Sequence, residues 1–172
     1  MRSLPFLVVL ALGLMACGGS DSSNSSATAS SSESSTAQAT ASGAVDQTVT
    51  LQPKGNQMKY KQTEFTVAPG QTVKLVFENT ATSPSMQHNV VVLTSADEAA
   101  FRQVGEAGME AGSANDYVPE DMNQVLAYTA IAPPGETVSV TFTAPEETGD
   151  YGYVCTFPGH WATMQGTMKV RS

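Results

Sequence analysis

Residues 137–155 read TVSVTFTAPEETGDYGYVC, and this stretch decides the class of fold. Val138, Val140 and Phe142 alternate with polar residues, which is typical of a β-strand with one buried face. Turn-forming residues at 147–149 follow, and then a second run rich in Tyr and Val. The stretch therefore predicts two consecutive strands joined by a turn.

Runs of the same kind recur along the chain, separated by Pro-, Gly- and Asn-containing turns. They are TVTLQP (48–53), MKYKQTEFTV (58–67), QTVKLVFEN (71–79), HNVVVLT (88–94), VLAYTAI (125–131) and GTMKVRS (166–172). Many short strands with such punctuation indicate a β-sandwich or a small barrel. We expect an all-β domain of about eight strands.

One segment breaks the β pattern. Ser95 is followed three residues later by Glu98, which is the spacing of a helix-capping box, and the run to Met109 is rich in Ala, Glu and Gln. Phe101 and Val104 are three residues apart and can face the core. Two glycines weaken the later turns. We expect a helical flap, capped by Ser95 and inserted between strands.

The N-terminus predicts export. Residues 1–16 combine a basic start with a short apolar run, as a secretory signal peptide does. The tetrapeptide LMAC (14–17) resembles a bacterial lipoprotein box, so we expect Cys17 to be lipidated and to anchor the chain on the extracytoplasmic side of a membrane. The alternative is an ordinary cleaved signal that leaves a free thiol at Cys17.

Residues 17–43 predict a tether and residues 44–172 a single domain. The tether is dominated by Ser and Thr and has no aromatic residue, so it lacks the apolar surface needed to fold. Residues 44–172 carry 14 acidic and 7 basic side chains. An acidic domain excludes nucleic acid as a partner, because nucleic-acid binding needs a basic footprint.

Residues 155–166, CTFPGHWATMQG, contain the ligand types of a metal site. Cys155, His160 and Met164 are spaced by five and four residues, and the chain's other histidine, His88, opens an apolar run. Two imidazoles, a thiolate and a weak thioether are the donor set of blue-copper electron-transfer sites. Zinc accepts two His and one Cys, but a thioether is a poor fourth ligand for it. Taken singly, each residue has another reading: a buried core thiol, a hydrogen-bonded strand-end histidine and core-filling methionine.

The run CTFPGHWATMQGTMKV (155–170) resembles the copper loop of azurins and auracyanins, blue-copper proteins of the cupredoxin family. The stretch MQHN (86–89) resembles the first ligand region of the same family. The resemblance implies a Greek-key β-sandwich that holds one type 1 copper ion. It implies His88, Cys155 and His160 as the strong ligands, Met164 as the long axial one, and the backbone carbonyl of Gln87 as a weak opposite contact.

The resemblance also assigns residues around the ligands. Asn89 would hydrogen-bond between the two ligand loops, with Thr156 beside it, and the amides of Asn89 and Phe157 would donate to the sulfur. His160 would present its ring edge to solvent as the exit for the electron. Met86 and Trp161 would form an apolar docking patch around it, although Trp161 can equally serve in packing.

The function implied by this resemblance is the carriage of single electrons between membrane-associated redox complexes. The expected partners are redox proteins such as cytochrome c or a quinol-oxidising membrane complex, with a terminal acceptor, and we expect a monomer. The alternative is an extracytoplasmic copper chaperone or storage protein. We expect no enzyme, because multicopper enzymes need further histidines and the chain has only two.

Overall fold

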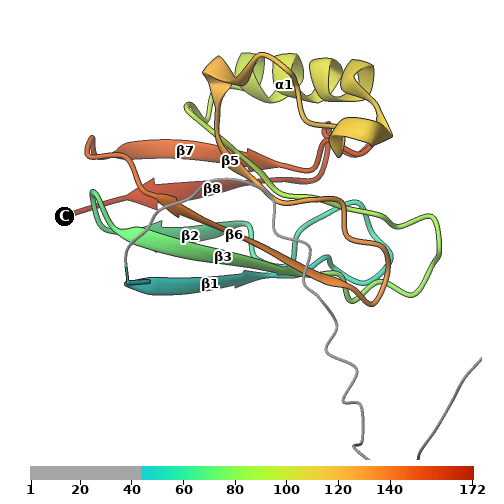
Figure 1. Cartoon of the computed structure of the whole chain (residues 1–172), viewed down its shortest axis with the longest axis horizontal. Helices are drawn as coiled ribbons and strands as arrows, with labels where there is room; N and C mark the ends of the chain where they lie inside the picture. The colour runs from blue at the N-terminus through green and yellow to red at the C-terminus, as the bar shows by residue number, and fades with distance from the viewer. Residues whose placement is uncertain (1–43) are drawn as a thin grey trace, which may run out of the picture. The chain divides into compact units, whose positions relative to one another are not determined.

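The computed structural model describes residues 44–172, in which eight strands form two sheets packed face to face (Figure 1). The first sheet has the order β1-β3-β6, with bounds Gln47–Leu51, Thr72–Glu78 and Thr137–Thr143. The second has the order β2-β8-β7-β4-β5, with bounds Glu64–Val67, Gln165–Val170, Gly149–Val154, Val91–Leu93 and Val125–Tyr128. The predicted signal peptide, Cys17 and tether lie outside the described residues.

The all-β sandwich of eight strands with one inserted helix is confirmed. Two pairings, β1 with β3 and β2 with β8, are parallel, and the others are antiparallel. The run predicted at 58–67 forms a strand only from Glu64, because Tyr60 pairs instead with Pro53 in an isolated bridge. Strand β4 begins at Val91 rather than at His88, which forms its own bridge to Ala132.

The core lies between the two sheets, and the alternation seen in the sequence places its residues. Leu75, Phe77 and Val140 project inward from the first sheet and meet Val92 and Tyr153 from the second. All three residues of β4 are buried, which is explained by cover on both faces of this strand. Its Val91 and Leu93 belong to a second apolar cluster on the outer face.

Helix α1 (Glu98–Ala111) provides that cover and lies across the second sheet (Figure 1). Phe101 and Val104 are buried against the sheet, as predicted. The predicted cap is wrong, because the N-cap residue is Asp97. The hydroxyl of Ser95 instead donates to the carboxylate of Asp97 and accepts from the backbone amide of Asp97. This local turn uses the hydrogen-bonding capacity of the Ser95 hydroxyl before the helix starts, so the hydroxyl does not cap the helix.

Two single-turn 3₁₀ helices follow α1 before β5 begins. They are η1 (Ser113–Asn115) and η2 (Met122–Gln124). Within residues 44–172, no helix is both long enough and apolar enough to span a membrane. The connection from α1 to β5 reaches the segment that carries His88, because the carbonyl of Asp116 accepts from Asn89.

Candidate metal centre

Cys155 and His160 come from the loop that joins β7 to β8. Cys155 follows the last residue of β7, and its amide donates to the carbonyl of Met164 at 3.0 Å, which closes the loop at its base. Inside the loop, the amides of Thr163 and Met164 both donate to the carbonyl of His160, at 3.0 and 2.8 Å. Gly159 turns the chain with φ +81°, a value that glycine adopts without steric cost. The loop is therefore fixed by its own backbone.

His88 lies on a separate segment that is tied to Ala132. The amide of His88 donates to the carbonyl of Ala132 at 3.2 Å, and the return bond measures 2.7 Å. The buried side chain of Asn79 adds two bonds, donating to the carbonyls of Met86 at 2.7 Å and Ala132 at 2.8 Å. The backbone on both sides of His88 is thus held in place by the protein itself.

Three donor atoms converge from these two segments. The Nδ1 atoms of His88 and His160 are 3.1 Å apart, and the sulfur of Cys155 lies 3.7 and 3.6 Å from them. The centre of this triangle is about 2.0 Å from each atom, close to the bond lengths of about 2.0–2.3 Å that nitrogen and sulfur make to zinc. The spacing fits one small metal ion bound by all three.

The protonation chemistry of the site also fits a metal. Burial lowers the pKa of His88 to about 4, with a further contribution from His160, and burial lowers the pKa of His160 as well. Both imidazoles are therefore neutral near pH 7, the form that binds a metal. Among the described residues, Nε2 of His88 has no hydrogen-bond partner, so the polar contacts of this ring are made through Nδ1.

Burial dominates the chemistry of the sulfur. It raises the pKa of Cys155 to about 12, while hydrogen bonds from the backbone amides of Asn89 and Phe157 act in the opposite direction. In the absence of a cation the thiol is therefore protonated. The two amides are already aimed at the atom on which a metal would hold negative charge.

Asn89 joins the two ligand segments. Its Oδ1 accepts from the amide of Thr156 at 2.9 Å, and its Nδ2 donates to the Thr156 hydroxyl at 2.8 Å. Its Nδ2 also donates to the carbonyl of Asp116 at 2.9 Å, and its own carbonyl accepts from the hydroxyl of Tyr60 at 2.7 Å. Every bond is made at a buried or partly buried position, where loss of a partner leaves an unsatisfied group.

The residues predicted as axial contacts neighbour the ligand residues in the core or in the chain. Met164 is completely buried in the same apolar cluster as Cys155. Gln87 precedes His88 and is half-buried. The roles of the Met164 sulfur and the Gln87 carbonyl as ligands remain predictions.

The predicted surface residues differ in their surroundings. His160 keeps 4% of its surface exposed, whereas His88 keeps none, and Met86 is half-buried. Trp161 packs against α1: a Cβ placed on Gly105 would lie 2.3 Å from the indole Cγ. The indole therefore has a packing role, and its part in a docking patch is not needed to explain its position.

Two residues of the site were missed in the sequence. Asn79 ends the predicted strand at 71–79, where an asparagine ordinarily indicates a turn, and Asp116 lies in a loop whose fold the sequence does not specify. Both residues act through contacts between distant parts of the chain. Asn79 and its partner Ala132 are 53 residues apart in the sequence, and Asp116 and its partner Asn89 are 27 residues apart. No local motif marks such contacts.

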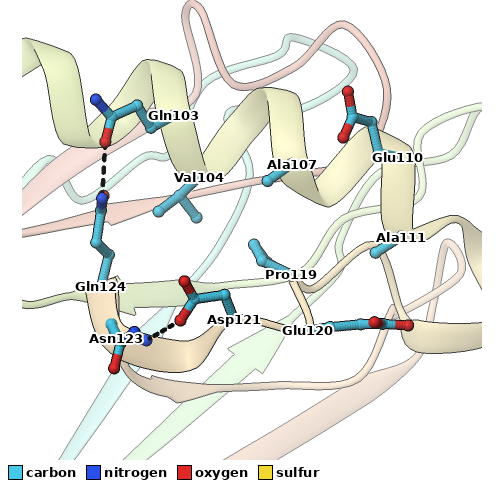
Figure 2. A pocket seen from close by; sticks show the side chains of 10 residues that line it. All are labelled: Gln103, Val104, Ala107, Glu110, Ala111, Pro119, Glu120, Asp121, Asn123 and Gln124. Atoms are coloured by element: carbon cyan, nitrogen blue, oxygen red, sulfur yellow. Dashed lines mark hydrogen bonds between the residues drawn. The ribbon is translucent and has the colours of Figure 1, made fainter.

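A groove of about 450 Å³ lies between α1 and the segment 119–124 (Figure 2). It has three carboxylate-bearing residues, Glu110, Glu120 and Asp121, and a hydrogen bond of 2.7 Å between Gln124 and Gln103 at one end. Its lining includes none of the predicted metal ligands. The groove is thus separate from the metal centre.

Comparisons with known proteins agree with the donor set. Residues 47–171 match the family described as copper-binding proteins of the plastocyanin/azurin family. Auracyanin-A of Chloroflexus aurantiacus is 41% identical over 170 residues, which is 99% of this chain and 96% of that protein. Azurin of Alcaligenes faecalis is 42% identical over 111 residues, covering 63% of this chain and 80% of the azurin.

Solved structures give the same result. The solved structure of auracyanin A, described as a "blue" copper protein from the photosynthetic bacterium Chloroflexus aurantiacus, has a TM-score of 0.67 at 40% identity, covering 72% of this chain and 98% of that one. Dithionite-reduced auracyanin from Roseiflexus castenholzii has a TM-score of 0.67 at 36% identity, covering 76% of this chain and all of that one.

Proposed function

This chain belongs to the plastocyanin/azurin family of copper-binding proteins, and from that membership we propose that it carries single electrons between membrane-associated redox complexes. One type 1 copper ion would be held by His88, Cys155 and His160. Bound copper would supply the one-electron Cu(II)/Cu(I) couple. The protein would supply the ligands, hold them in position and exclude water from the ion.

The observation that carries the proposal is the triangle of His88, Cys155 and His160 donors, 3.1–3.7 Å apart and buried. Soft thiolate with two imidazoles selects copper over oxygen-seeking cations. Met164 and the carbonyl of Gln87 are proposed as weak axial contacts. Among residues 44–172, the group of side chains that could hold a metal consists of His88, Cys155 and His160 and includes no carboxylate.

The residues around the triangle limit rearrangement. His88 is held by Ala132 and Asn79, Cys155 by the loop-closing bond to Met164, and both segments by Asn89. A ligand set that moves little when the charge of the ion changes needs little reorganisation during electron transfer. Burial also excludes water from the ligand atoms, so no substrate reaches them.

We propose His160 as the point of electron entry and exit, because it is the ligand histidine with exposed surface. Three uncharged residues of its own loop, Pro158, Gly159 and Ala162, are exposed. On the side toward α1, Ala162 also lines a groove with Glu98 and Arg102. Met86 would lie at the edge of this patch. A surface of this kind suits brief contact with a redox partner such as cytochrome c, a quinol-oxidising complex or a terminal acceptor.

We also propose that Cys17 is lipidated, that the chain is exported, and that residues 17–43 tether residues 44–172 to the extracytoplasmic face of a membrane. Support comes from the lipoprotein-like LMAC sequence at 14–17 and the Ser/Thr-rich stretch after it. Such an anchor would confine a monomeric carrier to the surface where its partners lie. The domain boundaries at residues 17 and 44 are part of this proposal.

Neither enzymatic activity nor copper storage is favoured. Auracyanin A is described as a "blue" copper protein, and both histidines of this chain lie at the one site, which leaves none for the extra copper centres of oxidases. A chaperone needs an ion that exchanges readily. Here the three donors are at most 4% exposed, and the methionines of 44–172 are dispersed.

The test is the visible spectrum of the full chain loaded with Cu(II). We expect an intense thiolate-to-copper band that disappears on addition of one electron per copper and returns on oxidation. Cys155→Ser should abolish the band while circular dichroism still shows a folded sandwich, whereas the matched variant Cys17→Ser should keep it. A colourless Cu(II) protein would refute the proposal.

A further inference from the structure

Asp116 and Tyr117 adopt a backbone conformation that is unusual for their types. Their φ angles are +53° and +56°, in the left-handed region. Residues other than glycine rarely adopt this region, although Asp tolerates it better than an aromatic residue does. Such a residue is strained and persists only where its surroundings hold it. The contacts of this pair therefore need an explanation.

Besides the bond from its amide to the carbonyl of Ser113, Asp116 accepts two hydrogen bonds, one from each segment of the bridge between His88 and Ala132. Its carbonyl accepts from Nδ2 of Asn89 at 2.9 Å, and its Oδ1 accepts from the amide of Ile131 at 2.9 Å. Asn89 is the neighbour of His88 in the chain, and Ile131 is the neighbour of Ala132, which pairs with His88. One residue thus joins both strands of the bridge that positions this histidine.

Tyr117 extends the same contact to the Cys155 loop. Its ring packs edge-on against Phe157 with centroids 5.3 Å apart, and the amide of Phe157 is one of the two that hydrogen-bond to the Cys155 sulfur. Gly108 of α1 makes room for this turn, because a Cβ there would lie 2.4 Å from the Tyr117 carbonyl. The segment after α1 therefore contacts both ligand segments.

We propose that Asp116 is a positioning residue of the metal centre, acting through Asn89 and Ile131 rather than by contact with the ion. The inference rests on the copper site proposed above. The left-handed backbone of Asp116 presents its carbonyl to Asn89, while its side chain accepts from the amide of Ile131. One residue therefore fixes the orientation of the His88 segment relative to the helical insertion. Partners of metal ligands commonly contribute 10–100-fold to metal affinity.

Two substitutions separate the hydrogen bond from other properties of Asp116. Asp116→Gly keeps the left-handed backbone and its carbonyl but removes the acceptor for Ile131. Asp116→Asn keeps an acceptor oxygen and tolerates the same φ. The matched control is Asp121→Gly, which removes a similar carboxylate bond, to the amide of Asn123, at an exposed position.

The full chain of each variant is titrated with Cu(I) against a competing chelator, and the Cu(II) spectrum is recorded. Asp116→Gly should lose about 10-fold or more in affinity and shift the visible band. Asp116→Asn and Asp121→Gly should stay close to wild type in both. Wild-type affinity and band in a folded Asp116→Gly, or an Asn variant as impaired as the Gly variant, would overturn the inference.

A second measurement covers a failure of Asp116→Gly to fold. If the bridge and the ion are coupled, removal of copper from the wild-type chain must loosen the bridge. Amide exchange of Ile131 should then accelerate more than that of Asn123 when the Cu(I) form is compared with the metal-free form. Equal acceleration overturns the role of Asp116. A wild-type chain that binds no copper would overturn the copper site as well.

Discussion

The Nδ1 atoms of His88 and His160 lie 3.1 Å apart although 72 residues separate the two histidines in the chain. Both rings are buried, and their centroids are 4.8 Å apart. Without a cation between them, two imidazoles this close cannot both be protonated at low cost. The metal-free protein should therefore be sensitive to acid at this point.

The metal-free protein should lose stability as the pH falls from about 6.5 toward 4. The pKa of His88 is about 4 in the folded state against 6.5 when unperturbed, so between these values the unfolded chain binds the extra proton and the folded chain does not. The loss should approach about 3 kcal/mol at the acid end. Urea midpoints measured across this range should fall, and a much smaller fall is expected in His88→Gln. A flat profile for the wild type would contradict the proposed neutral His88.

Copper loading at about pH 7 should release one proton per ion. The pKa of Cys155 is raised to about 12, so its thiol is protonated, whereas both histidines are already neutral. Calorimetric titration with Cu(II) in two buffers of different ionisation enthalpy gives the proton count. Cys155→Ser should release none, and a wild-type count of zero would mean that the thiol does not bind the metal as thiolate.

Gly105→Ala should destabilise the fold by about 1–3 kcal/mol, because the added methyl group would overlap the indole of Trp161. The intrinsic preference of helices for Ala over Gly offsets about 1 kcal/mol of this cost. Adding Trp161→Ala should remove most of the penalty in the double variant. Gly149→Ala is the control, since the nearest atom to its Cβ is an ordinary 3.5 Å away. Equal melting temperatures of the two single variants would show that α1 is free to move off the ligand loop.

Asn79→Ala should cost about 1–3 kcal/mol and lower copper affinity. The substitution removes the side-chain donor to the carbonyl of Met86 and one of the two donors to the carbonyl of Ala132, on either side of His88. Asn115→Ala is the matched control, because that side chain makes one exposed bond of 3.3 Å at the end of α1. Unfolding by urea and Cu(I) competition measure the two effects. If both variants behave alike, Asn79 has no special part in holding the His88 segment.

Cys17→Ser should release the protein from the membrane fraction into the soluble fraction, because the substitution removes the proposed site of lipidation. Cell fractionation followed by immunoblotting provides the readout. The control is Cys155→Ser, which should stay with the membrane although it loses its colour. Membrane association that survives Cys17→Ser would rule out anchoring at that residue.

Much of the fold follows from local pattern. Short runs rich in Val, Thr, Tyr and Phe, several of which alternate apolar and polar residues, predicted all eight strands, and the Ala-rich interruption predicted the helix. The prediction of Ser95 as the helix cap was wrong, because a serine that bonds to Asp97, two residues later, has the same spacing to Glu98 as a serine in a capping box. The start of β4 was placed three residues early, because His88 pairs with Ala132 alone before the ladder resumes at Val91.

The triangle of ligands was predictable from donor chemistry and from the scarcity of candidates. The chain has two histidines, and residues 44–172 contain one cysteine. The residues that hold the ligands were less accessible. Asn89 could be named because it adjoins His88, whereas Asn79 and Asp116 act through backbone carbonyls and amides, which every residue type offers. Only three-dimensional structure shows which of these groups meet.

Strand β8 lies between β2 and β7 in the five-stranded sheet, although it is the last strand of the chain. Its parallel pairing with β2 brings together Val67 and Val170, which are far apart in the sequence of the domain. The chain must therefore be made as far as β8 before this sheet can close, and the ligand loop, which ends where β8 begins, cannot be closed at its base before then. Folding of such long-range pairings is slow, so the newly made chain passes through a period in which two strand edges and the thiol of Cys155 are all unprotected.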